Sequence, residues 1–424
     1  MKQFNFTKYI MYNKSQNYLS YFEWELLLSF YRIPSQDLRK PHPLISKLRK
    51  TIKNFIVPYL FQFTQLYNKI SSDTVIYESY FAIKNMESEL NKIGFKVTQP
   101  PWRLSKNGYD SAIYKISTVL KENVDKGLNS ILSEDFQNLV ELYMSYLYKY
   151  YKNSNIKAII LPYDLPANEK ISIEIFKKLN KPSFIFLHGG MPAHYTTHRF
   201  NTSDYLMVWG DEHKKNYIKE GFNEDKIIVT GHPYYQKIVD YVEYRFDLKN
   251  ILVLSKPPVG GQKTDKIILQ DLANSLLYLY MIEDVLKSIG ISNVRLRLHQ
   301  SDDICYYENN INTDFYKFDK NYLKKSLSES SLIIGPGSTV FLEALCYGVN
   351  YVIFEPSIDG IGMNNYKLCT PLIGDDPEIP VANSTNELKY ILKLKISVNP
   401  NVLKKYMKTP FNLNAVKKII DQNY

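Results

Sequence analysis

Short apolar runs alternate with longer amphipathic stretches along most of this chain. Between residues 73 and 100, for example, TVIYE is followed by SYFAIKNMESELNKIG and then by FKVTQPP. Apolar runs that alternate with helix-like stretches at this spacing predict βαβ units, and therefore a parallel sheet covered by helices on both faces. We predict an α/β protein.

The alternation occurs in two series. The first includes the runs KAIILPYD, SFIFLHGG, YLMVWG and KIIVTGHP, and the second begins with ILVLS after a polar stretch, residues 236–250, that we expect to be helical. A chain of 424 residues is also long enough for two domains of roughly 200 residues each. We predict two Rossmann-like, doubly wound domains that face a cleft, residues 1–243 and 244–400, and a C-terminal helix, residues 401–424, that packs back on the first domain.

The composition narrows the class of protein. Hydrophobic residues make up 45% of the chain, yet no window approaches the roughly 18 to 20 apolar residues that a membrane helix requires. The N-terminus is too polar and aromatic for a signal peptide, so we expect a cytoplasmic protein. The chain has three cysteines and no CxxC spacing, which argues against a disulfide framework and a zinc site.

The net charge of +10 is unevenly distributed. Residues 39–69 join basic side chains to Ile, Phe, Tyr and Leu, a combination that suits peripheral contact with the anionic inner face of the cytoplasmic membrane. A solvated helix with an ordinary core face is the alternative. We find no nucleic-acid-binding module, and the aromatic residues lie in apolar runs, so we expect no nucleic-acid partner.

The residues directly after the apolar runs are the candidate site residues, because ligands of open parallel sheets bind beyond the carboxyl ends of the strands. These positions hold Asp164, His188 to Gly190, Gly210 and Asp211, Gly231 to Pro233, Ser255 and Lys256, His299, Gly335 to Thr339, and Glu355.

The segment SLIIGPGSTVFLEALCYGVNYVIFEP, residues 331–356, carries the clearest signal. Gly335 and Gly337 let the backbone approach a ligand, and Ser338 or Thr339 is expected to cap a helix whose free N–H groups suit a phosphate. Glu343, about one turn further, is near enough to reach a ribose hydroxyl. The alternative is an N-cap and a helix with a satisfied Glu.

This segment resembles the nucleotide-binding part of GT-B glycosyltransferases, in which Gly and Ser or Thr precede Glu-Ala-Leu and a Gly. His299 in RLRLHQSDD strengthens the resemblance, because CMP-sugar-using sialyl- and Kdo-transferases and CDP-glycerol-type polymerases often carry a His-Pro after this strand. Gln300 stands where those families have proline. In those families both motifs face the phosphate of the donor.

Residues 187–235 resemble the capsule and surface-polysaccharide branch of the same superfamily, with a His-Gly, an aromatic-Gly before a helix, and a Gly-x-Pro. The two resemblances together cover residues 155–360. They imply transfer of a sugar, with a leaning toward a CMP-activated acidic sugar such as Kdo or sialic acid, from a nucleotide sugar to a glycan or lipid-linked glycan acceptor.

Transfer needs a base for the acceptor hydroxyl and groups that stabilise the departing phosphate. We favour Asp164 as the base; the alternative is that it caps the helix expected at residues 167–179 or stabilises a Pro turn. His188 is its rival, ahead of Asp211 and Glu78. The expected donor-binding residues are Lys256, Arg297, His299, Gly335, Gly337, Ser338, Thr339 and Glu343.

We expect no metal and no cofactor besides the nucleotide-sugar cosubstrate. His188, His194 and His198 lack a spacing typical of zinc ligands, and no Asp-x-Asp follows a strand. The alternatives are a UDP-sugar-dependent transferase and an enzyme like the UDP-GlcNAc 2-epimerases on the same fold.

Overall fold

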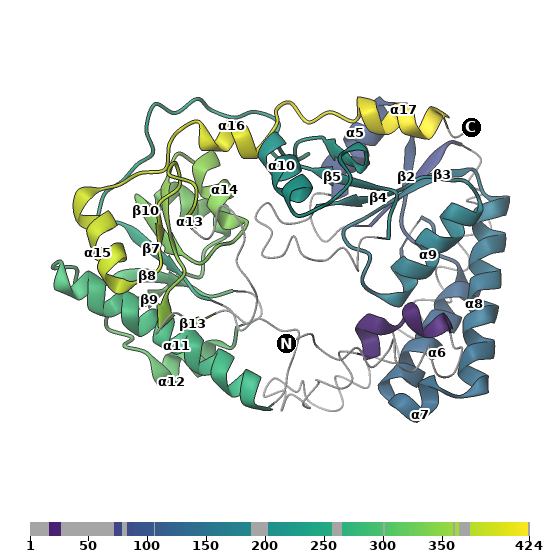
Figure 1. Cartoon of the computed structure of the whole chain (residues 1–424), viewed down its shortest axis with the longest axis horizontal. Helices are drawn as coiled ribbons and strands as arrows, with labels where there is room; N and C mark the ends of the chain where they lie inside the picture. The colour runs from purple at the N-terminus through teal and green to yellow at the C-terminus, as the bar shows by residue number, and fades with distance from the viewer. Residues whose placement is uncertain are drawn as a thin grey trace.

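The computed structural model describes residues 17–26, 72–78, 83–105, 107–187, 202–256, 265–299, 302–358, 361–363 and 374–422. Two six-stranded sheets form the two halves of the molecule, and every pair of neighbouring strands in them is parallel. Helices lie beside both sheets (Figure 1). The predicted α/β class with two Rossmann-like, doubly wound domains is confirmed.

The first sheet has the order β2-β1-β3-β4-β5-β6. Its strands are Thr74–Tyr77 (β1), Lys96–Thr98 (β2), Ile156–Leu161 (β3), Ser183–Phe186 (β4), Tyr205–Val208 (β5) and Ile227–Val229 (β6). The helical elements of this half are Asn17–Ser20 (η1), Ile83–Lys92 (α5), Ser111–Asp125 (α6), Leu128–Ile131 (α7), Glu134–Asn153 (α8), Ala167–Lys178 (α9), Asp211–Lys219 (α10) and Glu224–Lys226 (η3).

The second sheet has the order β14-β11-β10-β7-β8-β9. Its strands are Ile251–Leu254 (β7), Val294–Arg297 (β8), Tyr316–Phe318 (β9), Leu332–Gly335 (β10), Asn350–Phe354 (β11) and Val381–Ala382 (β14). A small antiparallel pair, Ser357–Ile358 (β12) and Ile361–Gly362 (β13), lies outside it. The helices of this half are Asp265–Ser288 (α11), Ile304–Asn310 (α12), Leu323–Glu329 (α13), Val340–Cys346 (α14) and Thr385–Leu394 (α15).

Most residues of the central strands are apolar because helices cover both faces of the sheets. All residues of β1, β4, β7, β10 and β11 are buried. Edge strand β2 has the exposed residue Lys96, and edge strand β9 has the exposed residue Lys317. The run of apolar residues that predicted each central strand is therefore the consequence of two-sided burial.

The C-terminal segment crosses from the second half to the first (Figure 1, yellow). It forms two helices, Val402–Tyr406 (α16) and Asn414–Gln422 (α17), so the expectation of one helix over residues 401–424 is wrong. Between them, Lys408 N donates to Trp209 O at 2.8 Å, and Asn412 N donates to Thr230 O at 2.9 Å. The helix is interrupted here, where these N–H groups donate to the loops that follow β5 and β6 instead of to carbonyls of their own segment.

The helix expected over residues 236–250 is also absent from this described segment, which is irregular apart from a bridge between Arg245 and Val349. Arg245 N donates to Gly348 O at 2.9 Å, and Arg245 Nη2 donates to Tyr347 O at 2.9 Å. The backbone N–H of Arg245 thus donates to a carbonyl just after α14 instead of to a carbonyl of a local helix. Tertiary contacts override the helical pattern of the sequence.

Candidate active site at the carboxyl ends of the strands

The strand order of the second sheet indicates where on its carboxyl edge a ligand would bind. The chain runs from β7 to β8 and β9 on one side, then returns to β10 on the other side of β7. At such a reversal the connections leave in opposite directions, and a crevice opens beyond the two central strands. The residues at this point are Ser255 and Lys256 after β7, and Pro336 and Gly337 after β10.

Lys256 and Gly337 are joined there by Glu355, which directly follows β11. Lys256 Nζ donates to Glu355 Oε2, and Gly337 N donates to Glu355 Oε1 at 2.7 Å. Lys256 Nζ also lies 5.8 Å from the centre of the Tyr278 ring. The side chains of Lys256 and Glu355 are only 7% and 1% exposed, so this ion pair is almost fully desolvated.

His299 is held at the neighbouring strand end by its backbone. His299 N lies 2.8 Å from Ser255 Oγ and 3.0 Å from Asp302 Oδ2, and Ser255 Oγ donates to that same carboxylate oxygen at 2.5 Å. Burial raises the pKa of Asp302, while the bonds from Ser255 and His299 lower it. The His299 side chain is exposed. This cluster therefore fixes the backbone of the β8 loop and presents the imidazole to solvent.

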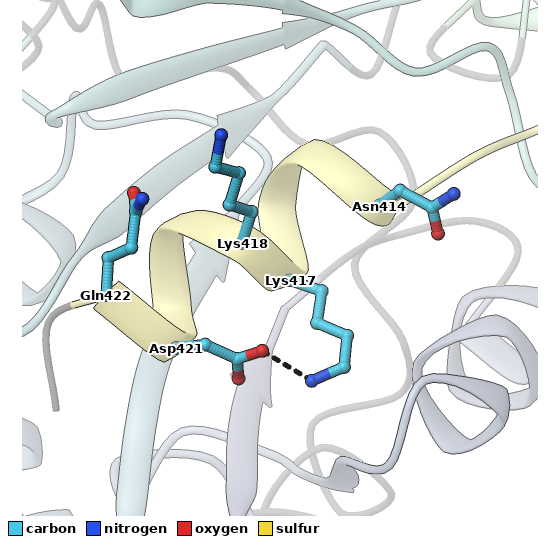
Figure 2. A pocket seen from close by; sticks show the side chains of 5 residues that line it. All are labelled: Asn414, Lys417, Lys418, Asp421 and Gln422. Atoms are coloured by element: carbon cyan, nitrogen blue, oxygen red, sulfur yellow. Dashed lines mark hydrogen bonds and ion pairs between the residues drawn. The ribbon is translucent and has the colours of Figure 1, made fainter.

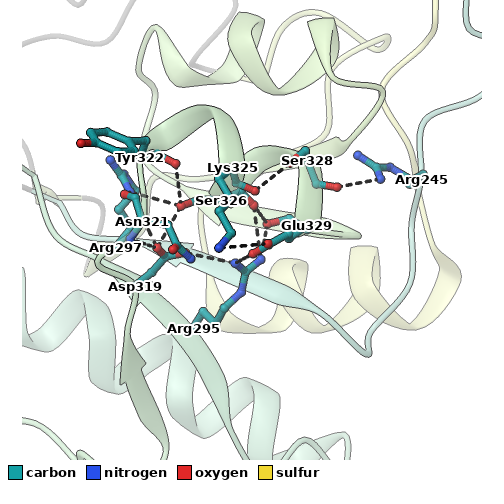
Figure 3. A network of polar contacts seen from close by, with 11 residues as sticks. Arg245, Arg295, Arg297, Asp319, Asn321, Tyr322, Lys325, Ser326, Ser328 and Glu329 are labelled. Carbon is teal, nitrogen blue, oxygen red and sulfur yellow. Dashed lines mark hydrogen bonds and ion pairs between the residues drawn. The ribbon is translucent and has the colours of Figure 1, made fainter.

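Arg297 belongs to a polar network beside this edge (Figure 3). Arg297 Nη1 donates to Asn321 O at 2.7 Å and to Ser326 Oγ at 3.2 Å, and it lies 3.8 Å from Asp319 Oδ1. Arg295, two residues earlier on the same strand face, pairs with Asp319 at 3.1 Å. Arg297 is thus anchored to the turn between β9 and α13.

The side chain of Tyr351 leaves no room for a Cβ atom at Gly335. A Cβ at this position would lie 2.2 Å from Tyr351 Oη, and Tyr351 Oη donates to Pro336 O at 2.6 Å. Thr339 is the N-cap residue of α14, as one of the two expected candidates, but it has helical backbone angles and makes no side-chain capping bond.

Glu343 faces the segment that connects the two sheets. The Tyr235 hydroxyl and Arg297 are both close enough to its carboxylate to affect it electrostatically. Burial raises the pKa of Glu343, whereas Tyr235 and Arg297 lower it. Tyr235 comes shortly after β6, so this contact joins the carboxyl edge of the first sheet to that of the second.

In the first sheet the order reverses at β1, which has β2 on one side and β3 on the other. Asp164 lies just after β3 and is buried. Its Oδ2 accepts bonds from Thr202 N and, at 3.1 Å, from Thr202 Oγ1. Burial raises the pKa of Asp164, and the bonds from Thr202 lower it. Asp164 thus lies at the expected edge but holds the segment that leads into β5.

Glu78 directly follows β1 at the same reversal and belongs to a buried carboxyl pair. Arg103 Nε donates to Glu78 Oε1 at 2.6 Å, and Arg103 Nη2 lies 4.0 Å from Glu169 Oε1. Burial raises the pKa of both carboxyls, and the charge of Glu78 raises that of Glu169 further. Two carboxyls face one guanidinium, so this group holds one proton more readily than isolated carboxylates do.

His188, together with His194 and His198, lies outside the described residues, so its role stays a prediction. Within the described ranges, no group of three His, Cys, Asp or Glu side chains could hold a metal ion. None of the described helices is long and apolar enough to cross a bilayer.

A shallow pocket lies on the surface of α17 and is lined by Asn414, Lys417, Lys418, Asp421 and Gln422 (Figure 2). Lys417 pairs with Asp421 at 2.5 Å and lies over the ring of Phe95, the residue before β2. Phe95 marks the amino end of the first sheet. The pocket is therefore away from the strand ends that carry the site.

Sequence reasoning assigned no role to Glu355, Asp302, Arg103 or Glu169. Glu355 had a usable signal, because it follows an apolar run as Lys256 does. Arg103 and Glu169 had none, since Arg103 lies in a loop and Glu169 in a helix. They meet Glu78 only in the folded protein.

No protein family and no curated protein matches the sequence. Among solved structures, the chain is similar to a UDP-GlcNAc 2-epimerase from Neisseria meningitidis bound to UDP-GlcNAc, with 12% identity, a TM-score of 0.43, and coverage of 82% of this chain and 98% of that one. The wall teichoic acid polymerase TagF gives 13% identity, a TM-score of 0.44, and coverage of 89% and 97%.

The lipopolysaccharide outer core galactosyltransferase WaaB gives 10% identity, a TM-score of 0.41, and coverage of 82% and 98%. At these values the similarities assign no activity to this chain.

Proposed function

We propose that this protein is a glycosyltransferase that moves a sugar from a nucleotide donor to a glycan acceptor. The observation that carries the proposal is the set of groups at the reversal of the second sheet. Lys256, the Gly337 N–H and the exposed His299 imidazole come from three neighbouring strand ends. A cation and a backbone donor at such a position suit the phosphate of a nucleotide.

These groups also suit the chemistry of transfer. When the bond between the sugar and the phosphate breaks, negative charge grows on the phosphate oxygens, and donors fixed in a dry site stabilise that charge. Glu343 remains our candidate for a ribose hydroxyl, with Arg297 beside it. Ser338 and Thr339 complete the expected donor set, and the reaction is proposed to need no metal.

The first domain is proposed to bind the acceptor. Asp164 and Glu78 both lie at the reversal of its sheet, and either carboxylate could accept the proton of an acceptor hydroxyl. We retain Asp164 as the first candidate and His188 as its rival. Contact with the inner membrane face is proposed from residues 39–69, which lie outside the described residues.

A nucleotide screen tests the proposal. A ligand that binds only the folded protein raises its melting temperature, so CMP, CDP, UDP and GDP are compared at equal concentration and ionic strength. We expect one of them to raise it, with CMP or CDP favoured. If none of the four has an effect, the proposed function is wrong.

The donor site is tested with the double variant Ser338→Ala/Thr339→Ala. We expect the preferred nucleotide to bind more weakly in calorimetry while the protein stays folded. The matched control is Ser292→Ala/Thr313→Ala, which removes two exposed hydroxyls at the amino ends of β8 and β9. Equal affinity in the two double variants would remove Ser338 and Thr339 from the site.

Incubation with UDP-GlcNAc and no acceptor distinguishes a transferase from an epimerase, which is the main alternative. A transferase leaves the sugar bound to its nucleotide or hydrolyses it slowly, whereas an epimerase changes the configuration of the sugar. Formation of the epimer at a turnover above that of hydrolysis would favour the epimerase.

A further inference from the structure

Glu355 occupies the position at which an anion would contact Lys256 and Gly337. Its two carboxylate oxygens are divided between them, one on the Lys256 ammonium and one, at 2.7 Å, on the Gly337 N–H. A phosphate uses the same two kinds of donor. The Glu355 carboxylate is therefore bound by the protein in the way that a phosphate oxygen pair would be.

We propose that Glu355 is an internal stand-in for the donor phosphate, and that a phosphate or pyrophosphate group must displace its carboxylate to reach Lys256 and Gly337. This inference rests on the proposed function for the identity of the physiological ligand, a nucleoside diphosphate or monophosphate sugar. The anion site itself is defined by these three residues alone.

Charge explains why the two anions exclude each other. A phosphate that contacted Lys256 with Glu355 in place would put two negative groups beside one cation, and like charges repel strongly where water is excluded. The side chains of the pair are 7% and 1% exposed, so little solvent screens them. Binding of a phosphate is therefore coupled to movement of the Glu355 side chain away from Lys256.

Burial also explains what removal of Glu355 would do. A buried ion pair that loses one partner leaves an uncompensated charge, which is unfavourable for the folded state. In Glu355→Gln the uncompensated charge is Lys256, and an external anion can neutralise it. The variant is expected to be less stable than the wild type without anions and to bind anions more tightly.

Inorganic pyrophosphate is the probe, and chloride keeps the ionic strength constant. We expect Glu355→Gln to have a lower melting temperature than the wild type, to regain it on addition of pyrophosphate, and to bind pyrophosphate at least about tenfold more tightly in calorimetry. The double variant Lys256→Met/Glu355→Gln lacks the cation and should lose this gain.

Glu283→Gln is the matched control. Glu283 is a largely buried carboxylate of the same domain that pairs with Lys287 at 2.6 Å on α11, near the amino end of β8. Its loss should leave pyrophosphate binding at the wild-type level. A folded Glu355→Gln that binds pyrophosphate no more tightly than the wild type would overturn the inference.

If Glu355→Gln does not fold, Glu355→Asp replaces it in the same experiment. The aspartate keeps the charge but is one methylene shorter, so it cannot span both donors, and we expect a smaller gain in affinity of the same sign. No gain in the folded Glu355→Asp variant contradicts the proposal.

The nucleotide arm separates this inference from the proposed function. If pyrophosphate binds Glu355→Gln more tightly but no nucleotide binds either protein, the stand-in role holds and the proposed function fails. If a nucleotide binds the wild type and Glu355→Gln equally well, the stand-in role fails and the proposed function holds.

Discussion

Arg103 Nε donates a hydrogen bond of 2.6 Å to Glu78, the residue that directly follows strand β1. The same guanidinium lies 4.0 Å from the buried Glu169. One cation thus faces two carboxyls at the reversal of the first sheet. The arrangement makes the stability of this domain depend on pH.

We predict that Glu169→Gln stabilises the protein at alkaline pH. The pKa of Glu169 is raised well above its ordinary value by burial and by Glu78. A raised pKa in the folded state contributes stability at low pH that is lost as pH rises through it. Glutamine keeps the shape and the hydrogen-bond donor without the charge.

The measurement is thermal unfolding from about pH 5 to about pH 9. We expect a gain on the order of 1 kcal/mol, or about 2–4 °C, near the alkaline end and little change near the acid end. A variant whose melting temperature falls equally at every pH would show that ionisation of Glu169 does not limit the stability of this domain.

Asp164→Asn and Glu78→Gln compare the two candidate bases. If Asp164 is the base, Asp164→Asn retains nucleotide binding and loses at least about a hundredfold in turnover. Asparagine can still accept the bonds from Thr202, so the fold is expected to persist. Near-normal turnover in Asp164→Asn with a large loss in Glu78→Gln would transfer the role to Glu78, and normal turnover in both would favour His188.

Gly335→Ala is expected to destabilise the protein because the new methyl group meets Tyr351 Oη at 2.2 Å. The expected loss is about 1–3 kcal/mol in chemical denaturation. In the Tyr351→Phe background the loss should be smaller by at least about 0.5 kcal/mol, since the hydroxyl is gone. Additive effects of the two substitutions would show that the close contact is not what excludes a side chain at residue 335.

Gly231→Ala is expected to loosen the C-terminal segment. Gly231 has φ +85°, and a Cβ there would lie 2.4 Å from Lys408 O. Gly94 is the matched control, because it has φ +98° and nothing within 4 Å of the added atom. Both alanines carry a backbone penalty of about 1–2 kcal/mol. Only Gly231→Ala should also make residues 401–422 sensitive to limited proteolysis, and equal protection in both would argue against the contact.

His232 is expected to weaken the protein in acid. Burial lowers its pKa from 6.5 to about 3, and its ring lies 4.4 Å from that of Trp209. A lowered pKa in the folded state means that stability is present above the unfolded value and is lost as pH falls from there toward the folded value. His232→Gln should therefore show a smaller fall in melting temperature between about pH 7 and about pH 5 than the wild type. An unchanged fall would mean that other groups carry the acid sensitivity.

The amino-acid sequence by itself determined the strands and the edge that carries the site. Burial on both faces of a parallel sheet imposes continuous apolar runs, and such runs are local patterns. The first residue after each run then lies on the carboxyl edge whatever the strand order is. This is why Lys256, His299 and Glu355 could be selected before the fold was known.

The tertiary structure decided which of these residues meet. Lys256 and Glu355 are 99 residues apart in the sequence. They can pair because the chain reverses at β7, which places their strands, β7 and β11, on the two sides of β10. Three other contacts likewise depend on strand order and on the path of the C-terminal segment. They are the close approach of Tyr351 to Gly335, the ion pairs of Arg103 with Glu78 and Glu169, and the hydrogen bond from Lys408 to Trp209. Which residues contact each other depends on their proximity in the folded protein and on the need to satisfy buried charges and backbone groups. A local sequence pattern encodes neither of these conditions.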